Sequence, residues 1–441
     1  MTERIYGDQN FRFSETSEAV FVTQIGADGS TETSSSNPFP ISIADGANLD
    51  AFSRLRTSHP VGLFSAQCQY DAEPLLFESG STGSGVTPTH SANDRMLTVS
   101  CTNTGTSFVQ SYEYIPYQAG KSQLIFITGV IGAAVANTVT EVGVFDAANG
   151  LFIRQASDGT ISAVRRTSTS GSVVDNVIPQ STWNLDKLDG TGASGITLDV
   201  TDTQILVIDA QFLAMGRVRF GFDIGGGIVY CHESLHANVL QVPYMQTLTL
   251  PVQMLMTSTG GSKNTTRFKC SSVSSEGGFA DDMGYSFATP EGTVTAASGA
   301  RTHILSLRPR TTFNSITNRS RIRPTSVEIF VTGANPVFWE LCVGSTFSAG
   351  PTYANVNATY SASEYSSAVG TLSAAGIVIA SGYVAATNQA KQAVSRDIAS
   401  RYPLSLNRAG AVRANGTLSL LVSGIGGTSA TRASLNYTEI R

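Results

Sequence analysis

Two histidines and a glutamate near the middle of the chain have the spacing of a zinc-protease motif. The stretch YCHESLHANV, residues 230–239, contains His232, Glu233 and His236. On a helix, side chains four residues apart lie roughly 6 Å apart along the axis and can bind one zinc ion. On a strand the same spacing is about 13 Å, so two histidines cannot both place a nitrogen about 2.1 Å from one metal. The element that carries the motif therefore decides its chemistry.

The residues before the motif predict a strand. Polar and apolar side chains alternate from Arg217 to Ile224, which is typical of a strand that is buried on one face. Gly225 and Gly226 then predict a two-residue hairpin turn, because such a turn needs positive φ angles. The returning strand would carry the first two residues of the motif.

The register of this hairpin makes the prediction specific. A two-residue turn sets Ile224 opposite Gly227, Phe220 opposite Cys231, and Arg219 opposite His232. We expect the Cys231 thiol to be buried and unreactive. The longer form of the motif would need glycine and histidine where the chain has Val239 and Val242. The sequence therefore predicts no metal at His232 and His236.

Three further stretches contain residue types that could do chemistry. AGKS, residues 119–122, ends like a phosphate-binding loop, but Ile115 replaces the required glycine and a strand follows, so we predict a turn with a solvated Lys121. Four aspartates in a glycine-rich loop could bind calcium, although capping of tight turns is favoured. Five arginines at 308–323, a stretch that contains Pro309 and is followed by Pro324, could bind phosphate, although we favour a role in bracing a domain junction or a subunit contact. These residues are Asp186, Asp189, Asp199 and Asp202, and Arg308, Arg310, Arg319, Arg321 and Arg323. We expect no catalytic, cofactor-binding or metal-binding site.

The composition excludes several classes of protein. Charged residues make up only 14% of the 441 residues, and the net charge is −5. No basic stretch is dense enough for a nucleic-acid partner, and no run approaches the about 18 apolar residues of a membrane span. The first residues lack the apolar segment of a signal peptide, so we expect synthesis in a cytoplasm. The cysteines, expected to be reduced and packed as small apolar residues, are Cys68, Cys101, Cys231, Cys270 and Cys342.

Short strand-like runs bounded by Gly, Asn and Asp predict an all-β, multi-domain protein with a jelly-roll or β-sandwich body. We predict an extended N-terminal anchoring arm at 1–60, because the Ser/Thr-rich segment 26–40 cannot bury enough apolar surface to fold alone. The main domain is expected at 61–325 and a smaller C-terminal β-sandwich at 326–441. One helix is expected at 388–401, where apolar residues recur every four positions.

Several blocks together resemble a family of structural virion proteins of tailed bacteriophages. The blocks are AFSRLRTSHPVGLFSAQCQYD (51–71), YIPYQAGKSQLIF (114–126), WNLDKLDGTGASGITLDVTDTQILVID (183–209), the hairpin at 216–238 and LNYTEIR (435–441). They span most of the chain in the family's order. The resemblance implies a structural role without catalytic residues, in a particle assembled inside the host bacterium.

The sequence thus favours a non-enzymatic component of a phage virion. We expect a fibre-like or capsid-decoration protein on the tail or head, which forms a homo-oligomer, with a trimer favoured, and contacts other virion proteins. The alternative is a carbohydrate-binding or carbohydrate-active host-adhesion module, because β-sandwiches support both roles; a host surface glycan would then be a partner. Aromatic residues that could bind a sugar are Trp183, Trp339, Tyr353, Tyr360 and Tyr365.

Overall fold

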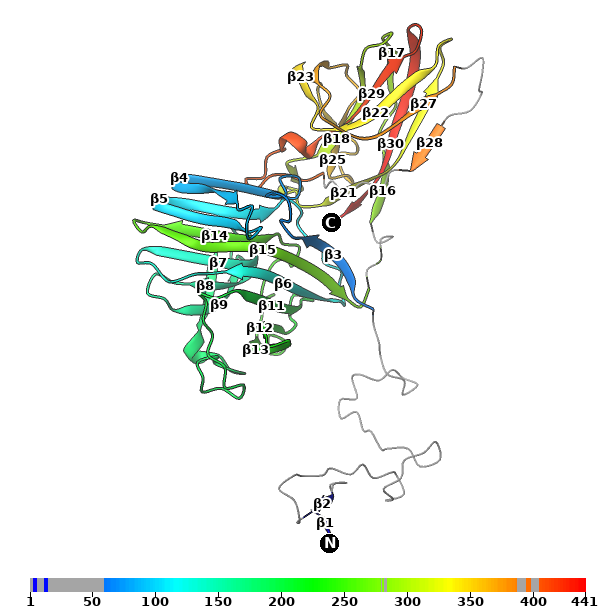
Figure 1. Cartoon of the computed structure of the whole chain (residues 1–441). Helices are drawn as coiled ribbons and strands as arrows, with labels where there is room; N and C mark the ends of the chain where they lie inside the picture. Colours follow the sequence, from blue (N-terminus) through cyan, green and yellow to red (C-terminus); the bar gives the residue numbers. More distant parts are fainter. Residues whose placement is uncertain are drawn as a thin grey trace. The chain divides into compact units, whose positions relative to one another are not determined.

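The structure is a computed structural model that describes residues 59–278, 280, 284–386 and 404–441, and the backbone of 3–5, 12–14 and 394–397 (Figure 1). Its contacts divide the chain into two units, Met1–Ser58 and His59–Arg441. Most of the predicted arm lies outside the described residues. Within it, β1 (Glu3–Ile5) pairs with β2 (Arg12–Ser14) in antiparallel orientation.

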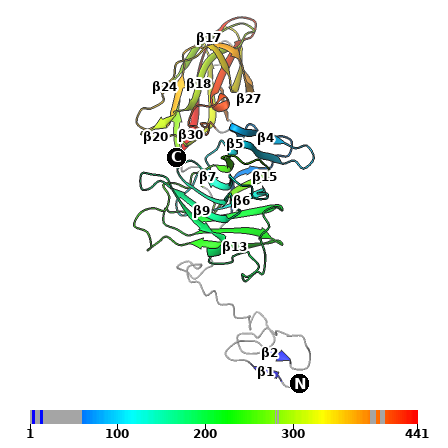
Figure 2. The same ribbon diagram turned by 90° about the vertical axis from the view of Figure 1, so that its left-hand side faces the viewer.

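The described residues confirm the all-β prediction. Two short 3-10 helices occur in them, η2 (Gln180–Thr182) and η4 (Ala414–Gly416), and neither has the length or apolar character to cross a membrane. The other elements are strands, and those from β3 onward form two bodies, each with its own buried core. Figure 2 shows both bodies from a second side.

The first body is built on one continuous antiparallel ladder in the order β10-β9-β8-β7-β14-β5-β15-β6-β11-β12-β13, with β4 on β5 and β3 on β15. Its strands are β3 (Val61–Ala66), β4 (Phe77–His90), β5 (Leu97–Ser111), β6 (Ser122–Val130), β7 (Thr138–Phe145), β8 (Gly150–Gln155), β9 (Ile161–Thr167), β10 (Val174–Pro179), β11 (Gln204–Gln211), β12 (Val218–Ile224), β13 (Gly227–Ser234), β14 (Val252–Ser258) and β15 (Lys263–Glu276).

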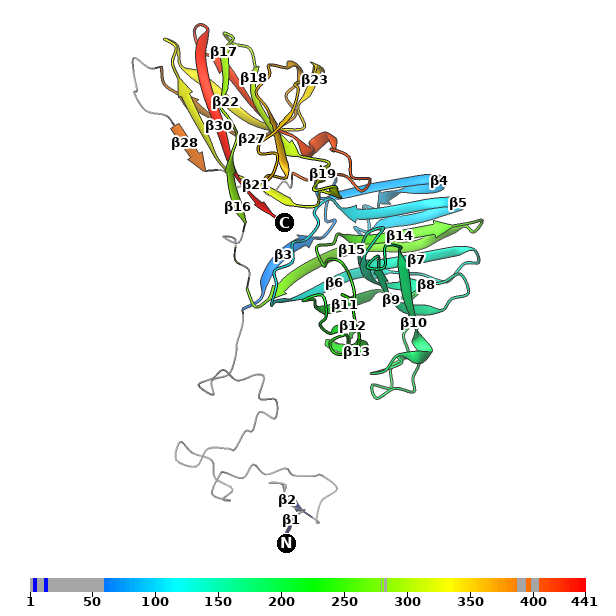
Figure 3. The ribbon, with the colours of Figure 1, turned by 180° about the vertical axis from the view of Figure 1, so that it is seen from behind.

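The ladder folds over on itself at β5, a long strand whose two halves have different partners. Its first half pairs with β15, and its second half pairs with β14. We call β4, β14, β7, β8, β9 and β10 layer A, and β3, β15, β6, β11, β12 and β13 layer B. Val142 and Ile153 of layer A and Ile125 and Phe220 of layer B all belong to one buried cluster, so the two layers form a sandwich (Figure 3).

The second body contains two main sheets around a core that includes Trp339, Leu420 and Tyr437. One sheet has the order β16-β30-β21-β28 with β17 on β30, and the other has the order β24-β25-β18-β29-β22-β27. The strands are β16 (Tyr285–Ala288), β17 (Gly292–Ala296), β18 (Thr302–Pro309), β19 (Thr312–Phe313), β20 (Ile316–Thr317), β21 (Arg321–Val331), β22 (Val337–Val343), β23 (Thr346–Ala349), β24 (Ala354–Asn355), β25 (Ser363–Ser366), β26 (Thr371–Ala374), β27 (Ile377–Val384), β28 (Val394–Asp397), β29 (Leu418–Gly424) and β30 (Ser429–Ile440).

The strand pairing bears on the position, along the sequence, of the boundary between the two bodies. The predicted boundary between 325 and 326 falls inside β21. Strands β16 and β17 pair with β30, and β18 pairs with β29, so residues from 285 onward share sheets with the C-terminal strands. We propose a boundary between β15 and β16 in place of the one at 325.

The helix predicted at 388–401 is wrong for the part of it that the structure describes. Val394–Asp397 forms β28, which pairs with β21. A spacing of four is even, so it also places residues on one face of a strand, and pairing with a neighbouring strand overrides the helical interpretation.

Candidate functional site

The hairpin that carries the histidine motif has the predicted turn and strands, but not the predicted register throughout. Ile224 lies opposite Gly227, and His232 and Glu233 lie on β13, as expected. A bulge at Cys231 then shifts the pairing by one, so Arg219 faces Glu233 and Phe220 faces His232. The expected pairs Arg219–His232 and Phe220–Cys231 are therefore wrong. The bulge has a cause, because the Cys231 carbonyl accepts hydrogen bonds from the backbone of Leu185 and Asp186, each at 3.1 Å.

The two histidines of the motif are buried and have different neighbours. The His232 Nε2 lies 3.2 Å from the Ser234 hydroxyl. His236 lies beyond the end of β13, where its Nδ1 is 2.6 Å from the Gly216 carbonyl oxygen and its ring stacks on Tyr244 at 4.1 Å. Burial lowers the pKa of both imidazoles. Across the described residues, no group of three or more His, Cys, Asp or Glu side chains is arranged to hold a metal.

The aspartate loop caps turns, as the sequence favoured. Asp186 accepts hydrogen bonds from the Leu188 and Ser194 backbone, both at 2.8 Å. Asp189 and Asp199 each accept a hydrogen bond from the backbone NH two residues later. Lys121 is not simply solvated: its Nζ donates to the Gly277 carbonyl at 2.6 Å. The strand β6 begins directly after it, so the phosphate-loop interpretation finds no helix there.

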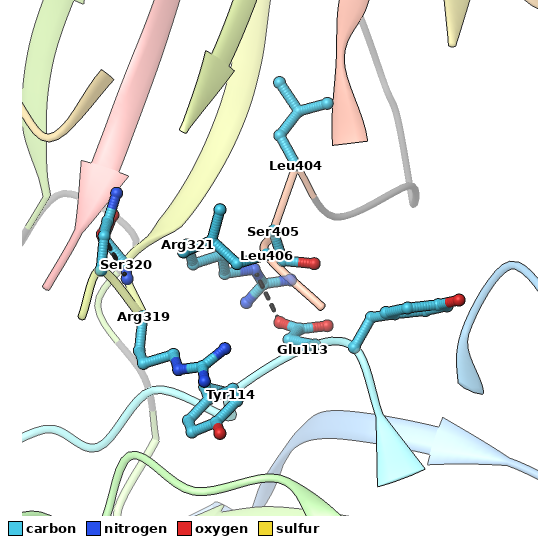
Figure 4. A pocket seen from close by; sticks show the side chains of 10 residues that line it. Glu113, Tyr114, Arg319, Ser320, Arg321, Leu404, Ser405 and Leu406 are labelled. Atoms are coloured by element: carbon cyan, nitrogen blue, oxygen red, sulfur yellow. Dashed lines mark hydrogen bonds and ion pairs between the residues drawn. The ribbon is translucent and has the colours of Figure 1, made fainter. Parts of the chain in front are cut away.

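Arginines of the second body contact the segment of the first body that follows β5. The Arg321 Nε lies 3.0 Å from Glu113 Oε1, and the Arg319 guanidinium lies over the Tyr114 ring at 4.2 Å. Figure 4 shows these side chains around a cavity of about 10 Å³ that Leu404 and Ser405 also line. The volume leaves room for about one water molecule. This part of the arginine cluster braces the two bodies against each other, as the sequence favoured.

The tryptophans and most of the tyrosines named as sugar platforms are unsuited to that role. Trp183 and Trp339 are 3% and 2% exposed and belong to the two cores. Tyr353 is covered by the Arg308 guanidinium at 3.4 Å, and Tyr365 packs against the second core. Tyr360 is the member of this group that remains open, at 67% exposed.

On the outer face of layer A, arginine side chains that pair with carboxylates lie over the aromatic rings. We call this face the closed face. Phe145, Phe152 and Val164 form a small buried cluster on it, and the Arg166 guanidinium lies 5.0 Å from the centre of the Phe152 ring. Arg166 also donates to Asp175 at 2.8 and 3.0 Å. Burial by itself would raise the pKa of Asp175, but hydrogen bonds from its arginine neighbours outweigh burial and hold that pKa below its usual value.

The second body completes the cover of the closed face. The Arg408 backbone donates to the Glu78 carboxylate at 2.7 Å, and the Arg408 guanidinium lies 4.5 Å from the centre of the Phe108 ring. Arg413 covers Tyr112 in the same way at 4.0 Å. The charged and aromatic groups of this face are thus engaged by one another.

The outer face of layer B is different, and we call it the open face. Residues that point outward along β6 and β15, such as Phe126, Thr128 and Ser272, are only partly buried. Neighbouring strands add the exposed Ser65 of β3 and the partly buried Tyr230 of β13. The face therefore combines aromatic rings and neutral hydroxyl groups with the Asp209–Arg219 ion pair, whose arginine lies over the Tyr230 ring.

A cavity of about 390 Å³ opens on this face between β3, β15 and β6. Its lining residues are Ser65, Ala66, Gln67, Glu73, Phe126, Thr128, Cys270, Ser271 and Ser272. Hydroxyl and amide groups can both donate and accept hydrogen bonds, and an aromatic ring offers a flat apolar surface. Such a lining suits a neutral polyhydroxylated ligand.

The carboxylates on the open face are engaged by the fold. Glu73 Oε1 accepts hydrogen bonds from the Gln67 and Cys68 backbone, both at 3.0 Å. Asp209 pairs with Arg219, which also lies 4.0 Å from the centre of the Tyr230 ring. Every carboxyl group of the described residues whose pKa is clearly shifted has it lowered.

Sequence reasoning did not find this cavity. Its lining comes from positions near 65, 73, 126 and 270, which β-sheet pairing brings together across about 200 residues of chain.

Comparisons with known proteins place the chain in no family. No family model matches it, and no curated protein is detectably similar to it. The chain is similar to the solved structure of Bacteroides ovatus xyloglucan PUL GH43B, with a TM-score of 0.30 and 14% identity over 50% of this chain and 40% of that chain. It is also similar to the CBM2 module of the evolved Dit of Lactobacillus casei BL23 phage J-1, with a TM-score of 0.28 and 10% identity over 51% of this chain and 100% of that chain. A third similar structure is the binding domain of botulinum neurotoxin DC in complex with SialylT, with a TM-score of 0.30 and 9% identity over 74% of this chain and 98% of that chain. The chain thus spans less than half of the first of these.

These similarities carry no argument about function, because the TM-scores lie near 0.3 and the identities do not exceed 14%. The fold assignment rests on the strand pairing itself. One of the three structures comes from a phage, but no family model or sequence relative supports the virion family that the sequence blocks resemble.

Proposed function

We propose that the chain is a non-enzymatic, glycan-binding host-adhesion component of a tailed-phage virion, and that the cavity of the open face is its sugar-binding site. The cavity is the observation that carries the proposal. It presents the Phe126 ring beside neutral hydrogen-bonding groups of Ser65, Gln67 and Ser272. Sugars are bound by this combination, since an aromatic ring stacks on their apolar face while side chains satisfy their hydroxyls. The assignment to a phage particle rests on the resemblance of the sequence blocks.

The carboxylates support the proposed role without catalysis. Glu73 and Asp209 are engaged by backbone and arginine donors, and glycoside cleavage needs a second carboxyl group free to act as acid, base or nucleophile. The protein would hold a host glycan and leave it intact, as adhesion requires.

The experiment is a glycan array with the wild type, Phe126→Ala and Gln67→Ala. Gln67 is exposed, so its replacement tests the cavity without a threat to folding. Tyr383→Ala is the matched control, because this tyrosine is 70% exposed but lies on β27 of the second body. We expect binding that both cavity variants weaken by about tenfold or more and that the control retains. Binding that is equal in all four proteins, or glycan shortened during incubation, would contradict the proposal.

A second candidate, a purely structural virion subunit that forms oligomers, is favoured by one observation. Two loops tied together by the hydrogen bond from the Tyr244 backbone to the Ala214 carbonyl, at 2.9 Å, expose large apolar side chains. These are Leu213, Met215, Leu235, Val239, Leu240 and Val242, which are 39–68% exposed. Apolar patches of this kind mark contact sites, and a second copy of the chain is the occupant this candidate requires. Light scattering of the wild type and of Leu235→Ser/Val239→Ser tests it: a monomeric wild type would exclude it.

A further inference from the structure

The cavity of the open face has a single acidic residue, Glu73, in its lining. The other lining residues are of uncharged types: Ser65, Ala66, Gln67, Phe126, Thr128, Cys270, Ser271 and Ser272. The basic residues of the adjoining part of β15 have other partners. Arg267 pairs with Asp94, and the Lys269 Nζ donates to the Arg95 carbonyl at 2.7 Å. Within the residues that the structure describes, Glu73 forms no ion pair, so the cavity keeps one negative charge.

The surrounding loop engages the polar atoms of Glu73 with one exception. Its Oε1 accepts hydrogen bonds from the Gln67 and Cys68 backbone, both at 3.0 Å. Its backbone NH donates to Asp71 Oδ1 at 2.8 Å, and its carbonyl accepts from the Phe77 backbone at 2.8 Å. Its second carboxylate oxygen, Oε2, accepts no hydrogen bond from the described part of the chain. The loop thus holds the carboxylate in one orientation and leaves Oε2 as an acceptor for a ligand in the cavity.

Two further features set Glu73 apart from an ordinary surface glutamate. Its φ angle is 47°, in the left-handed region that residues other than glycine rarely adopt. Such conformations persist where surrounding contacts hold them, and they cluster at binding sites. The neighbouring Cys68 thiol also senses the charge, because burial first and the Glu73 carboxylate second raise the pKa of Cys68 to about 12. This end of the cavity is therefore electrically negative.

A carboxylate in this setting distinguishes glycans by their charge. It accepts hydrogen bonds from sugar hydroxyls, and such bonds are stronger than those between neutral groups. An acidic sugar would bring a second negative charge into the same cavity, where partial exclusion of water strengthens the repulsion. The uncharged lining offers that second charge no cationic partner.

We propose that Glu73 is the specificity-determining residue of the cavity: its Oε2 accepts hydrogen bonds from a neutral sugar that stacks on Phe126, and its charge excludes sugars that carry an acidic group. This inference rests on the proposed glycan-binding function and adds the ligand class, which is neutral glycan. Glu73 acts by recognition, and no covalent bond of the sugar changes.

The test is a glycan array of matched pairs, each a neutral hexose oligosaccharide and its counterpart with one C6 hydroxymethyl group oxidised to a carboxylate. The proteins are the wild type, Glu73→Gln, Gln67→Lys and the control Glu291→Gln, each checked by thermal melting. Glutamine at 73 removes the charge but retains an oxygen for the backbone donors of the loop. Glu291 belongs to the second body, where its side chain is 52% exposed and pairs with Arg432 at 3.1 Å, so the control removes the same charge away from the cavity.

For the wild type we expect the neutral member of each bound pair to bind at least tenfold more tightly than the acidic member. Glu73→Gln should reduce this preference to less than threefold, because it weakens the neutral glycan and admits the acidic one. Gln67→Lys changes an exposed position, leaves Glu73 in place and adds a positive charge, so it should also admit the acidic member. Glu291→Gln should keep the wild-type preference. If Glu73→Gln melts early, Gln67→Lys decides the test.

The outcomes separate the two proposals. Wild-type binding that is equal for both members of the pairs, or stronger for the acidic members, overturns the role of Glu73 but leaves glycan binding at the cavity intact. A preference for neutral glycans that persists unchanged in a folded Glu73→Gln protein overturns it as well. No binding by the wild type to any glycan of the array overturns both proposals.

Discussion

The two outer faces of the first body are made from the same alternating strands, yet one is closed and the other is open. On the closed face, Arg166 pairs with Asp175 and covers Phe152, and Arg408 of the second body covers Phe108. On the open face, Phe126 and Ser272 line a cavity of about 390 Å³ that no described side chain fills. The difference teaches that an outward-facing aromatic residue of a sandwich contributes to stability when a guanidinium group covers its ring. An aromatic ring that no guanidinium group covers is available to a ligand.

The largest effect is expected from Arg166→Ala on the closed face. The variant removes two hydrogen bonds to Asp175 and uncovers Phe152, and it leaves Arg154 as the arginine partner of Asp175 and Glu141. We expect the free energy of unfolding to fall by about 3 kcal/mol, measured by urea denaturation. The control is Arg217→Ala in layer B, whose side chain is 49% exposed and lies 3.8 Å from Glu233. The control should change stability by less than about 0.5 kcal/mol, and equal losses in both variants would refute the comparison.

Gly221→Ala should have the next largest effect, and it tests how closely the Tyr230 ring packs against the sheet on the open face. The new methyl group would meet the Val229 carbonyl and the Tyr230 ring. We expect a loss of about 2 kcal/mol in unfolding free energy from overpacking, seen in thermal and urea melts. Gly62→Ala on β3 is the matched control, since no atom lies within 4 Å of a Cβ built there. A Gly221→Ala protein as stable as that control would mean that the Tyr230 ring is not held against the sheet.

Acid should weaken the ion pairs of the closed face. The folded-state pKa of Asp175 is lowered by its arginine partners, so its contribution to stability is present above the unfolded value of about 3.9 and is lost as pH falls below it. Stability measured between pH 6 and pH 2 should therefore fall less steeply in Asp175→Asn than in the wild type. Parallel curves for the two proteins would contradict the assigned pairing.

Much of the fold was predictable from sequence, while the candidate site was not. The alternation at 217–224 and the Gly225–Gly226 turn predicted the hairpin, because both depend on local backbone preferences. The bulge at Cys231 was missed because it depends on hydrogen bonds from the distant Leu185 and Asp186. The cavity was missed for the same kind of reason: Phe126 and Ser272 become neighbours only through pairing of β6 with β15.

Thiol labelling gives the smallest perturbation, and it compares the open cavity with the buried cores. Cys270 lines the open cavity and is partly exposed, whereas Cys68, Cys101, Cys231 and Cys342 are buried. Burial raises the pKa of Cys68 and Cys231 to about 12, which further slows their reaction. A bulky maleimide should label one thiol per native chain, as counted by mass spectrometry, and Cys270→Ser should abolish that label. Rapid native labelling of Cys231 would contradict the buried register of the hairpin.

The central claim, that the open face binds glycan and the closed face supports the fold, is tested most directly by one binding measurement. Purified bacterial surface polysaccharides are applied to an array at a temperature at which the wild type, Phe126→Ala and Arg166→Ala all remain folded. The account predicts that Phe126→Ala loses binding by about tenfold or more while its melting temperature changes little, and that Arg166→Ala binds like the wild type although it melts earlier. Binding retained by Phe126→Ala and lost by Arg166→Ala would contradict it.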